Sequence, residues 1–119
     1  MSDVSIKKTV RCAVVHPYLK KTETDYRARL GEALGLARAI DLEIVYSDLI
    51  PLSDIKPKSY VGEGVIDTLC DVVRTHDLGL VIVDTALSPV QQRNLERALN
   101  CKVIDRTGLI LDIFGRRAQ

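Results

Sequence analysis

Residues 78–84 read Leu-Gly-Leu-Val-Ile-Val-Asp, an aliphatic run with no charge before Asp84. A strand that is apolar on both faces typically lies inside a parallel sheet, covered by helices on both sides. Just beyond it, Ser88-Pro89-Val90-Gln91 carries three signals of a helix start. These are a capping Ser, a Pro at the first helical position and a Gln that completes a capping box. The stretch therefore predicts one strand–helix unit of an α/β fold.

The same alternation extends outward from this unit. The expected strands are 9–15 (ended by His16-Pro17), 42–49 (bounded by Pro51), 78–84 and 102–105. The expected helices are about 24–40 (capped by Thr22 or Thr24), 64 or 65 to about 75, and 88 to about Asn100. The polar connector between the second strand and the second helix is expected to be a long loop, with a short extended piece around 59–61.

The last segment is ambiguous from its pattern. Leu109, Ile110, Ile113 and Phe114 are spaced as one helical face, whereas alternation through Leu111 would fit a strand. We favour the helix. The complete order, strand and helix in turn, then predicts a three-layer α/β fold with a mostly parallel four-stranded sheet flanked by helices.

Length and composition set the class of protein. With 119 residues the chain suits one domain, expected over 9–119 after a flexible N-terminus at 1–8. The formal net charge of +1 gives no overall attraction to nucleic acid. No apolar run reaches the ~18 residues of a membrane span, and the first residues lack the apolar core of a signal peptide. We therefore expect a cytoplasmic protein with no membrane association.

The cysteines and histidines show no metal-binding pattern. Cys12, Cys70 and Cys101 form no C-x-x-C pair, and neither His16 nor His76 stands at ligand spacing from them. We expect three reduced, buried thiols and no metal site.

Three loops follow expected strands, at the edge of the sheet where α/β proteins bind ligands. In the first, His16 could be a base and Lys20 and Lys21 could hold phosphate; the alternative is a surface loop that ends a strand. In the second, Gly62 and Gly64 precede a helix and could cradle an anion through backbone amides. Glu63 opposes that role, so a structural turn is favoured.

The third loop follows Asp84. A receiver-type phosphorylation site would need an acidic pair after the first strand, where this chain has His16. Asp84 is therefore expected to bond loop amides and fix the turn, together with Ser88 and Gln91. No Gly-Lys dipeptide occurs, so the P-loop that holds nucleotide phosphates is absent, and no catalytic residue is predicted.

Two longer motifs carry a family resemblance. Residues 83–96 (VDTALSPVQQRNLE) and 103–114 (VIDRTGLILDIF) closely resemble the N-terminal region of HflX-type GTPases, and 13–17 and 32–37 agree. The resemblance covers the chain from about Val10. The family tends toward a G-x-G-K-x-x-E-like turn, whereas this chain has Val65 at the lysine and Asp67 near the acidic place. That departure weakens an anion role for Gly62 and Gly64.

The resemblance implies a cytoplasmic GTPase that associates with the large ribosomal subunit in ribosome splitting or rescue. It implies GTP and Mg²⁺ for a G domain that follows a helical segment in the parent protein, and no cofactor in this chain. It also implies that this domain contacts its own G domain and helical segment.

A contact surface can be proposed from the charges. Its candidate residues, for ribosomal RNA or another domain, are Arg93, Arg97, Arg106, Arg116 and Arg117. The alternative is a solvated helix face whose arginines pair with Glu96. Three functions remain open: a recognition module without GTP hydrolysis, a small ATP-binding domain using the Gly62–Gly64 turn, and a structural packing domain whose isolated form self-associates.

Overall fold

The computed structural model describes residues 10–20 and 25–117, with side chains up to 113. Its strands are β1 (Arg11–Leu19), β2 (Glu43–Leu52), β3 (Leu80–Val83) and β4 (Lys102–Asp105). Its helices are α1 (Tyr26–Ala39), α2 (Glu63–His76), α3 (Pro89–Leu99) and α4 (Arg106–Arg117). All neighbouring strands are parallel, in the order β2-β1-β3-β4. The predicted α/β fold is confirmed.

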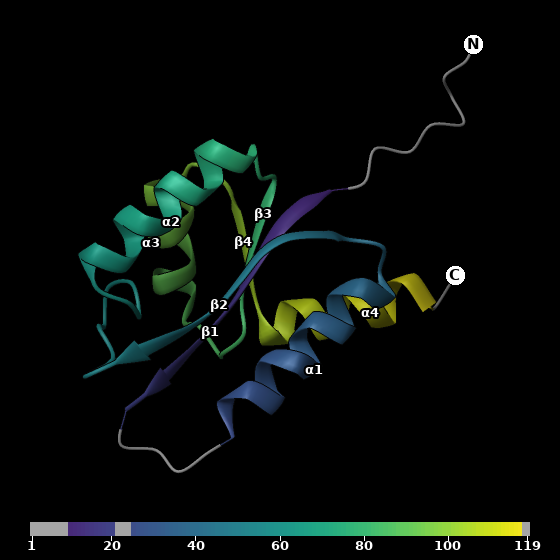
Figure 1. Cartoon of the computed structure of the whole chain (residues 1–119), viewed down its shortest axis with the longest axis horizontal. Helices are drawn as coiled ribbons and strands as arrows, with labels where there is room; N and C mark the ends of the chain where they lie inside the picture. The colour runs from purple at the N-terminus through teal and green to yellow at the C-terminus, as the bar shows by residue number, and fades with distance from the viewer. Residues whose placement is uncertain (1–9, 21–24, 118–119) are drawn as a thin grey trace.

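Helices cover both faces of this sheet. Figure 1 shows α2 and α3 on one face and α1 and α4 on the other. Side chains of successive strand residues point to opposite faces, so each face has its own aliphatic core. The α2/α3 core contains Ala13, Val15 and Val81, and the α1/α4 core contains Cys12, Val14 and Ile82. The two-sided burial expected of residues 80–83 is thus confirmed.

The two strands of the N-terminal half continue past prolines that were expected to end them. β1 includes Pro17 and β2 includes Pro51. Backbone groups of alternate residues point to the same side of a strand. The carbonyl of Val15 accepts from the N–H of Asp84 on the β3 side, so Pro17 also faces that side, where β3 has already ended. Its missing N–H therefore costs no ladder bond.

Helix ends follow their local chemistry. The Asp25 carboxylate accepts from the N–H of Ala28 and caps α1, whereas the predicted caps Thr22 and Thr24 lie outside the described residues. The capping box predicted for α3 is present: the Ser88 hydroxyl accepts from the N–H of Gln91, and the Gln91 side chain accepts from the N–H of Ser88. Asn100 ends that helix at φ 51°, as its residue type predicted.

The ambiguous segment is a helix, α4, which starts directly after β4 and earlier than expected. Oδ1 of Asp105 accepts from the N–H of Gly108 at 2.8 Å, the bond of an N-capping residue. The strand alternative is thereby excluded. The expected flexible N-terminus at 1–8 lies outside the described residues. Across the described ranges, no helix is long and apolar enough to cross a membrane.

Candidate functional site

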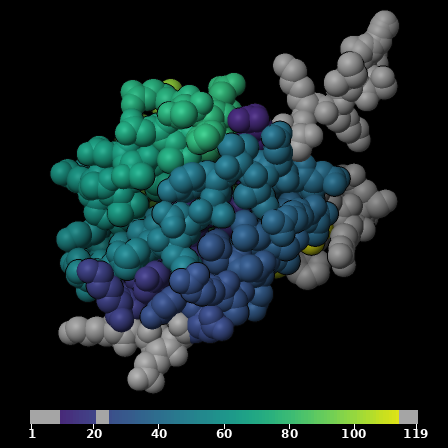
Figure 2. Space-filling model, viewed as in Figure 1, coloured from purple at the N-terminus to yellow at the C-terminus, as the bar shows by residue number. Residues whose placement is uncertain are grey.

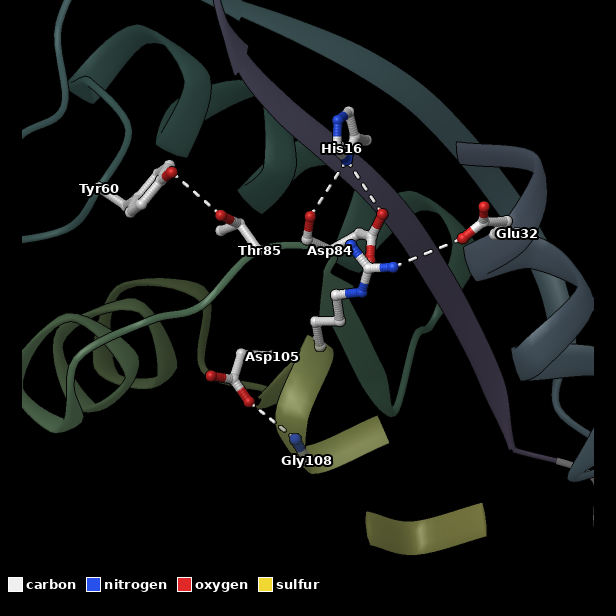
Figure 3. Close-up of polar contacts among 8 residues, drawn as sticks. His16, Glu32, Tyr60, Asp84, Thr85, Asp105 and Gly108 are labelled. Carbon is white, nitrogen blue, oxygen red and sulfur yellow. Dashed lines mark hydrogen bonds and ion pairs between the residues drawn. The ribbon is translucent and has the colours of Figure 1, made fainter. Parts of the chain in front are cut away.

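The carboxyl ends of β1 and β3 form the switch point of the sheet. The chain leaves β1 for β2 on one side and later returns to place β3 on the other side. Open α/β sheets bind ligands in the crevice at such a point. At this point lie His16 of β1 and Asp84, the residue that follows β3 (Figure 3).

His16 and Asp84 are directly bonded. Nδ1 of His16 lies 3.1 Å from the carbonyl oxygen of Asp84 and 3.0 Å from its Oδ2. Because a carbonyl oxygen can only accept, Nδ1 carries the hydrogen and donates it. The two side chains are 8% and 2% exposed, so this pair belongs to the interior of the molecule. His16 therefore does not lie in a surface loop, the alternative favoured from its His-Pro sequence.

An arginine from α4 extends the pair to the surface. Nε of Arg106 lies 3.8 Å from Oδ1 of Asp84, and its terminal nitrogen lies 3.4 Å from Oε2 of Glu32 on α1. The backbone N–H of Arg106 also donates to the carbonyl of Thr85. The four side chains connect β1, β3, α1 and α4; we call His16, Glu32, Asp84 and Arg106 the switch-point cluster.

The switch-point cluster is a poor receptor for nucleotide phosphate. Two carboxylates already surround the guanidinium of Arg106, so a phosphate would have to displace them. Nearby, the N-termini of α3 and α4 have their amides bonded to Ser88 and Asp105 side chains. These residues therefore do not fit a nucleotide phosphate.

The structure also corrects the role predicted for Asp84. Its carboxylate contacts the His16 ring and Arg106 rather than loop amides. The loop is held instead by Asp105, whose Oδ2 accepts from the N–H of Leu87 at 3.0 Å. One carboxylate at the end of β4 thus fixes the loop after β3 and caps α4. Ser88 and Gln91 act at the start of α3.

A second polar region is built around α3. The loop before α2 is bonded to this helix, because Gln91 Nε2 donates to the carbonyl of Lys56 and Asn94 Nδ2 donates to that of Lys58. Within the loop, Lys56 and Tyr60 form an antiparallel bridge, and the Tyr60 hydroxyl lies 3.0 Å from Oγ1 of Thr85. This bridge stands where a short extended piece was expected at 59–61.

The predicted arginines fall into separate groups. Arg93 and Arg97 lie one turn apart on α3 and are exposed, beside the loop that carries Lys58. Arg106 lies on the opposite face of the sheet, in the switch-point cluster. Arg116 and Arg117 lie in the last turn of α4, beyond the described side chains. Arg93 and Arg97 are exposed cations of α3, and Asn94 of the same helix bonds the backbone of the exposed Lys58. We call Lys58, Arg93 and Arg97 the α3 basic face.

Gly62 and Gly64 lie at the start of α2. Gly62 is the N-cap residue, in extended conformation, and no side chain caps this helix. A Cβ atom at either glycine would meet no atom within 4 Å, and neither has a positive φ. Neither the backbone nor the packing therefore requires glycine here. Asp48 lines the groove next to Gly64, and Glu63 is in the first turn, which makes the helix start acidic.

The cysteines differ in their surroundings. Burial, followed by the charge of Glu43, raises the pKa of the Cys12 thiol to about 11. Cys70 and Cys101 are half-buried, and burial also raises the pKa of Cys101. Of the described residues, no three His, Cys, Asp or Glu side chains gather as a metal site.

Comparison with known proteins assigns the family. Residues 27–115 match the model of the GTP-binding GTPase N-terminal family. The chain belongs to this family. A "GTPase HflX" of Magnetococcus marinus is 39% identical over 84% of this chain and 23% of its own length. The "GTPase HflX" of Escherichia coli is 54% identical over 53% of this chain and 15% of its own. The chain is an HflX N-terminal domain and spans about a quarter or less of these relatives.

Solved structures confirm the fold. The chain matches a GTP-binding protein of Sulfolobus solfataricus in complex with GDP at a TM-score of 0.61 and 20% identity, over 87% of this chain and 30% of that one. A structure described as an SsGBP and GDP complex matches at 0.68 and 18% identity, over 90% and 29%. At these identities the likeness shows a common fold.

Proposed function

We propose that the chain is the N-terminal recognition domain of a cytoplasmic HflX-type GTPase that associates with the large ribosomal subunit in splitting or rescue. Under this proposal the domain does not hydrolyse GTP; GTP and Mg²⁺ belong to a G domain of the longer protein. The observation that carries it is the filled switch point, where the buried side chains of His16 and Asp84 are bonded to each other. What remains for binding is the outer surface.

The α3 basic face supports an RNA contact on that surface. The loop carrying Lys58 is held on α3 by side chains bonded to two of its carbonyls, so its position relative to Arg93 and Arg97 is fixed. Glu96, the acidic residue of this helix, is engaged by the N–H of Val103. Exposed arginines one turn apart suit phosphate groups of RNA. Glu63 and Asp67 share a groove with Lys58, so Arg93 and Arg97 carry the proposed contact.

Binding to purified large ribosomal subunits tests this role. Removing a cation that binds one phosphate lowers the slope of log affinity against log salt by about 1. Replacing Arg93 and Arg97 by Ala should therefore reduce affinity and lower the slope by about 2. A matched control replaces Arg27 and Arg29, exposed on α1, by Ala. An equal fall in affinity for both variants, or no binding by the parent chain, would contradict the proposal.

The purified chain should also show no GTP turnover, alone or with large subunits. A rate that copurifies with the chain and disappears in Asp84→Asn would place hydrolysis at the switch point. That result would remove the recognition-only function.

One observation favours packing against another part of the longer protein. A groove of about 510 Å³ opens at the amino ends of the strands, under α4. Val10 and Leu111 line it and are 44% and 63% exposed. If this groove holds the helical segment or G domain of the longer protein, the isolated chain should self-associate through it. Charged substitutions at Leu111 would abolish that association.

A further inference from the structure

The sheet has one long free edge. β2 lies at the end of the strand order and has ten residues, whereas β4 at the opposite end has four. Figure 2 shows the β2 region as a band on the surface between α2 and α1. A long edge strand exposes unpaired N–H and carbonyl groups, which can pair with a strand of another molecule.

The direction of the backbone groups along β2 follows from its bonds to β1. The N–H of Lys20 donates to the carbonyl of Leu52 at 3.0 Å, so Leu52 faces β1. Alternate residues face the same way, which places Ile50 and Asp48 toward β1 as well. The backbone nitrogens of Ser47, Leu49 and Pro51 consequently point outward, along the free edge.

The nitrogens of Leu49 and Pro51 offer no hydrogen to a new strand, which leaves Ser47 as the outward donor of this stretch. The N–H of Leu49 donates to Oδ1 of the neighbouring Asp48 side chain at 2.9 Å. The Tyr46 hydroxyl donates to Oδ2 of the same carboxylate at 3.2 Å and holds it in place. Pro51 has no N–H. Toward the other end of β2 the register shifts opposite Cys12 and Ala13, which breaks the regular spacing of the edge.

We propose that Asp48, held by Tyr46, guards the free edge of β2 against pairing with the β2 edge of a second copy of this chain. A second copy is the proposed partner, because it presents the same edge and two identical edges can pair antiparallel about a twofold axis. The carboxylate acts twice: it occupies the Leu49 donor, and two copies would bring two such charges together. The guard does not depend on the proposed ribosomal function.

Removing the carboxylate tests the guard. Asp48→Ala frees the Leu49 N–H beside that of Ser47, and Asp48→Ala with Pro51→Val also adds the donor that Pro51 lacks. Both positions are exposed, so the core is unaffected. Asp48→Asn is the matched control, because its side-chain oxygen can still accept from Leu49. Asp54→Ala controls for loss of an exposed carboxylate that does not bond a backbone N–H of β2.

Sedimentation velocity gives the mass of each variant and of the parent chain over a series of concentrations. Any association through Val10 and Leu111 is then common to all samples. The double variant should shift from the mass of the parent species toward twice that mass as concentration rises. Asp48→Ala should shift less than the double variant. Asp48→Asn, which loses only the charge, should shift less than Asp48→Ala, and Asp54→Ala should not shift. In the double variant, amide exchange should slow with concentration at 44–51 only.

Three results would overturn the proposal. The first is a double variant that has the native circular dichroism spectrum and the parent's mass at every concentration. The second is association in which exchange slows outside β2 or in which the native spectrum is lost, because Asp48 would then support the fold rather than guard the edge. The third is equal association of Asp48→Asn and Asp48→Ala, which would leave no role for the bond to Leu49.

Discussion

Nδ1 of His16 lies 3.0 Å from Oδ2 of Asp84, which joins β1 to the residue after β3 inside the molecule. A buried carboxylate is stable only if other groups compensate its charge and its hydrogen-bonding capacity. Asp84 has both, from the His16 ring and from the guanidinium of Arg106. Among the described residues, no buried side-chain nitrogen or oxygen lacks a hydrogen-bond partner. The polar groups of the switch point are therefore satisfied by one another. Their contribution to the free energy of unfolding can be measured by substitution.

Asp84→Ala should destabilise the chain by about 2 kcal/mol, since it removes the buried carboxylate that accepts from Nδ1 of His16 and faces Arg106. Urea unfolding followed by circular dichroism gives the value. Glu32→Ala should cost less than about 1 kcal/mol, because Glu32 is 64% exposed and its contact with Arg106 is screened by water. Equal destabilisation by the two substitutions would show that burial does not determine the strength of this network.

Ser88→Ala should cost about 1 kcal/mol, because the hydroxyl accepts the N–H of Gln91 at the start of α3. Ser88→Asn supplies another acceptor at the same position and should recover most of the stability. Thermal unfolding of the three proteins is the measurement. A variant series in which Ala and Asn behave alike would exclude the capping bond as a source of stability.

Cys12 should be the slowest of the three thiols to react with iodoacetamide at pH 8. Burial raises its pKa to about 11, so less of the reactive thiolate is present than at an ordinary cysteine. Raising the pH toward 11 should increase its rate, as long as the fold persists. Peptide mass spectrometry resolves the three sites, and unfolding in urea should make their rates similar. Rapid labelling of Cys12 in the folded chain would disagree with its burial between the sheet and α1 and α4.

ATP and GTP at millimolar concentration should give no heat of binding in calorimetry with the isolated chain. The uncapped start of α2 at Gly62 is the best place for phosphate in the nucleotide-binding alternative, but Glu63 and Asp48 make it acidic. If heat is observed, Glu63→Lys distinguishes the site: binding at Gly62 and Gly64 should strengthen, whereas binding elsewhere should not change. A measurable affinity that Glu63→Lys increases would establish the alternative function.

Local patterns predicted the elements well but not the contacts among them. The aliphatic run at 80–83 and the Ser88 capping box have signals within a few residues, and both are present in the structure. The prolines misled the prediction of strand ends, because their missing N–H groups face positions without a neighbouring strand, and the strand order is not visible in the sequence. The N-cap role of Asp105 has a local signal, an Asp three residues before Gly108, that could have predicted the early start of α4.

The switch-point cluster could not be predicted for a different reason. His16 and Asp84 are 68 residues apart, and Arg106 meets Glu32 across 74 residues. Each looks like an ordinary polar residue in the sequence. The parallel pairing of β1 with β3 brings His16 to Asp84, and the packing of α1 beside α4 brings Glu32 to Arg106. The contact between Asn94 and the Lys58 carbonyl also has no local signal, because it forms only when the loop before α2 lies on α3.

The central position of β1 has a consequence during synthesis. β1 is made before its partner on the β3 side, which follows 68 residues later, counted from His16 to Asp84. At translation rates of about 5–20 residues per second, the interval is roughly 3–14 s. For that time β1 lacks the strand that pairs with one of its two edges. A nascent chain stalled before Asp84 should therefore engage hydrophobic-binding chaperones, and one extended beyond α4 should release them.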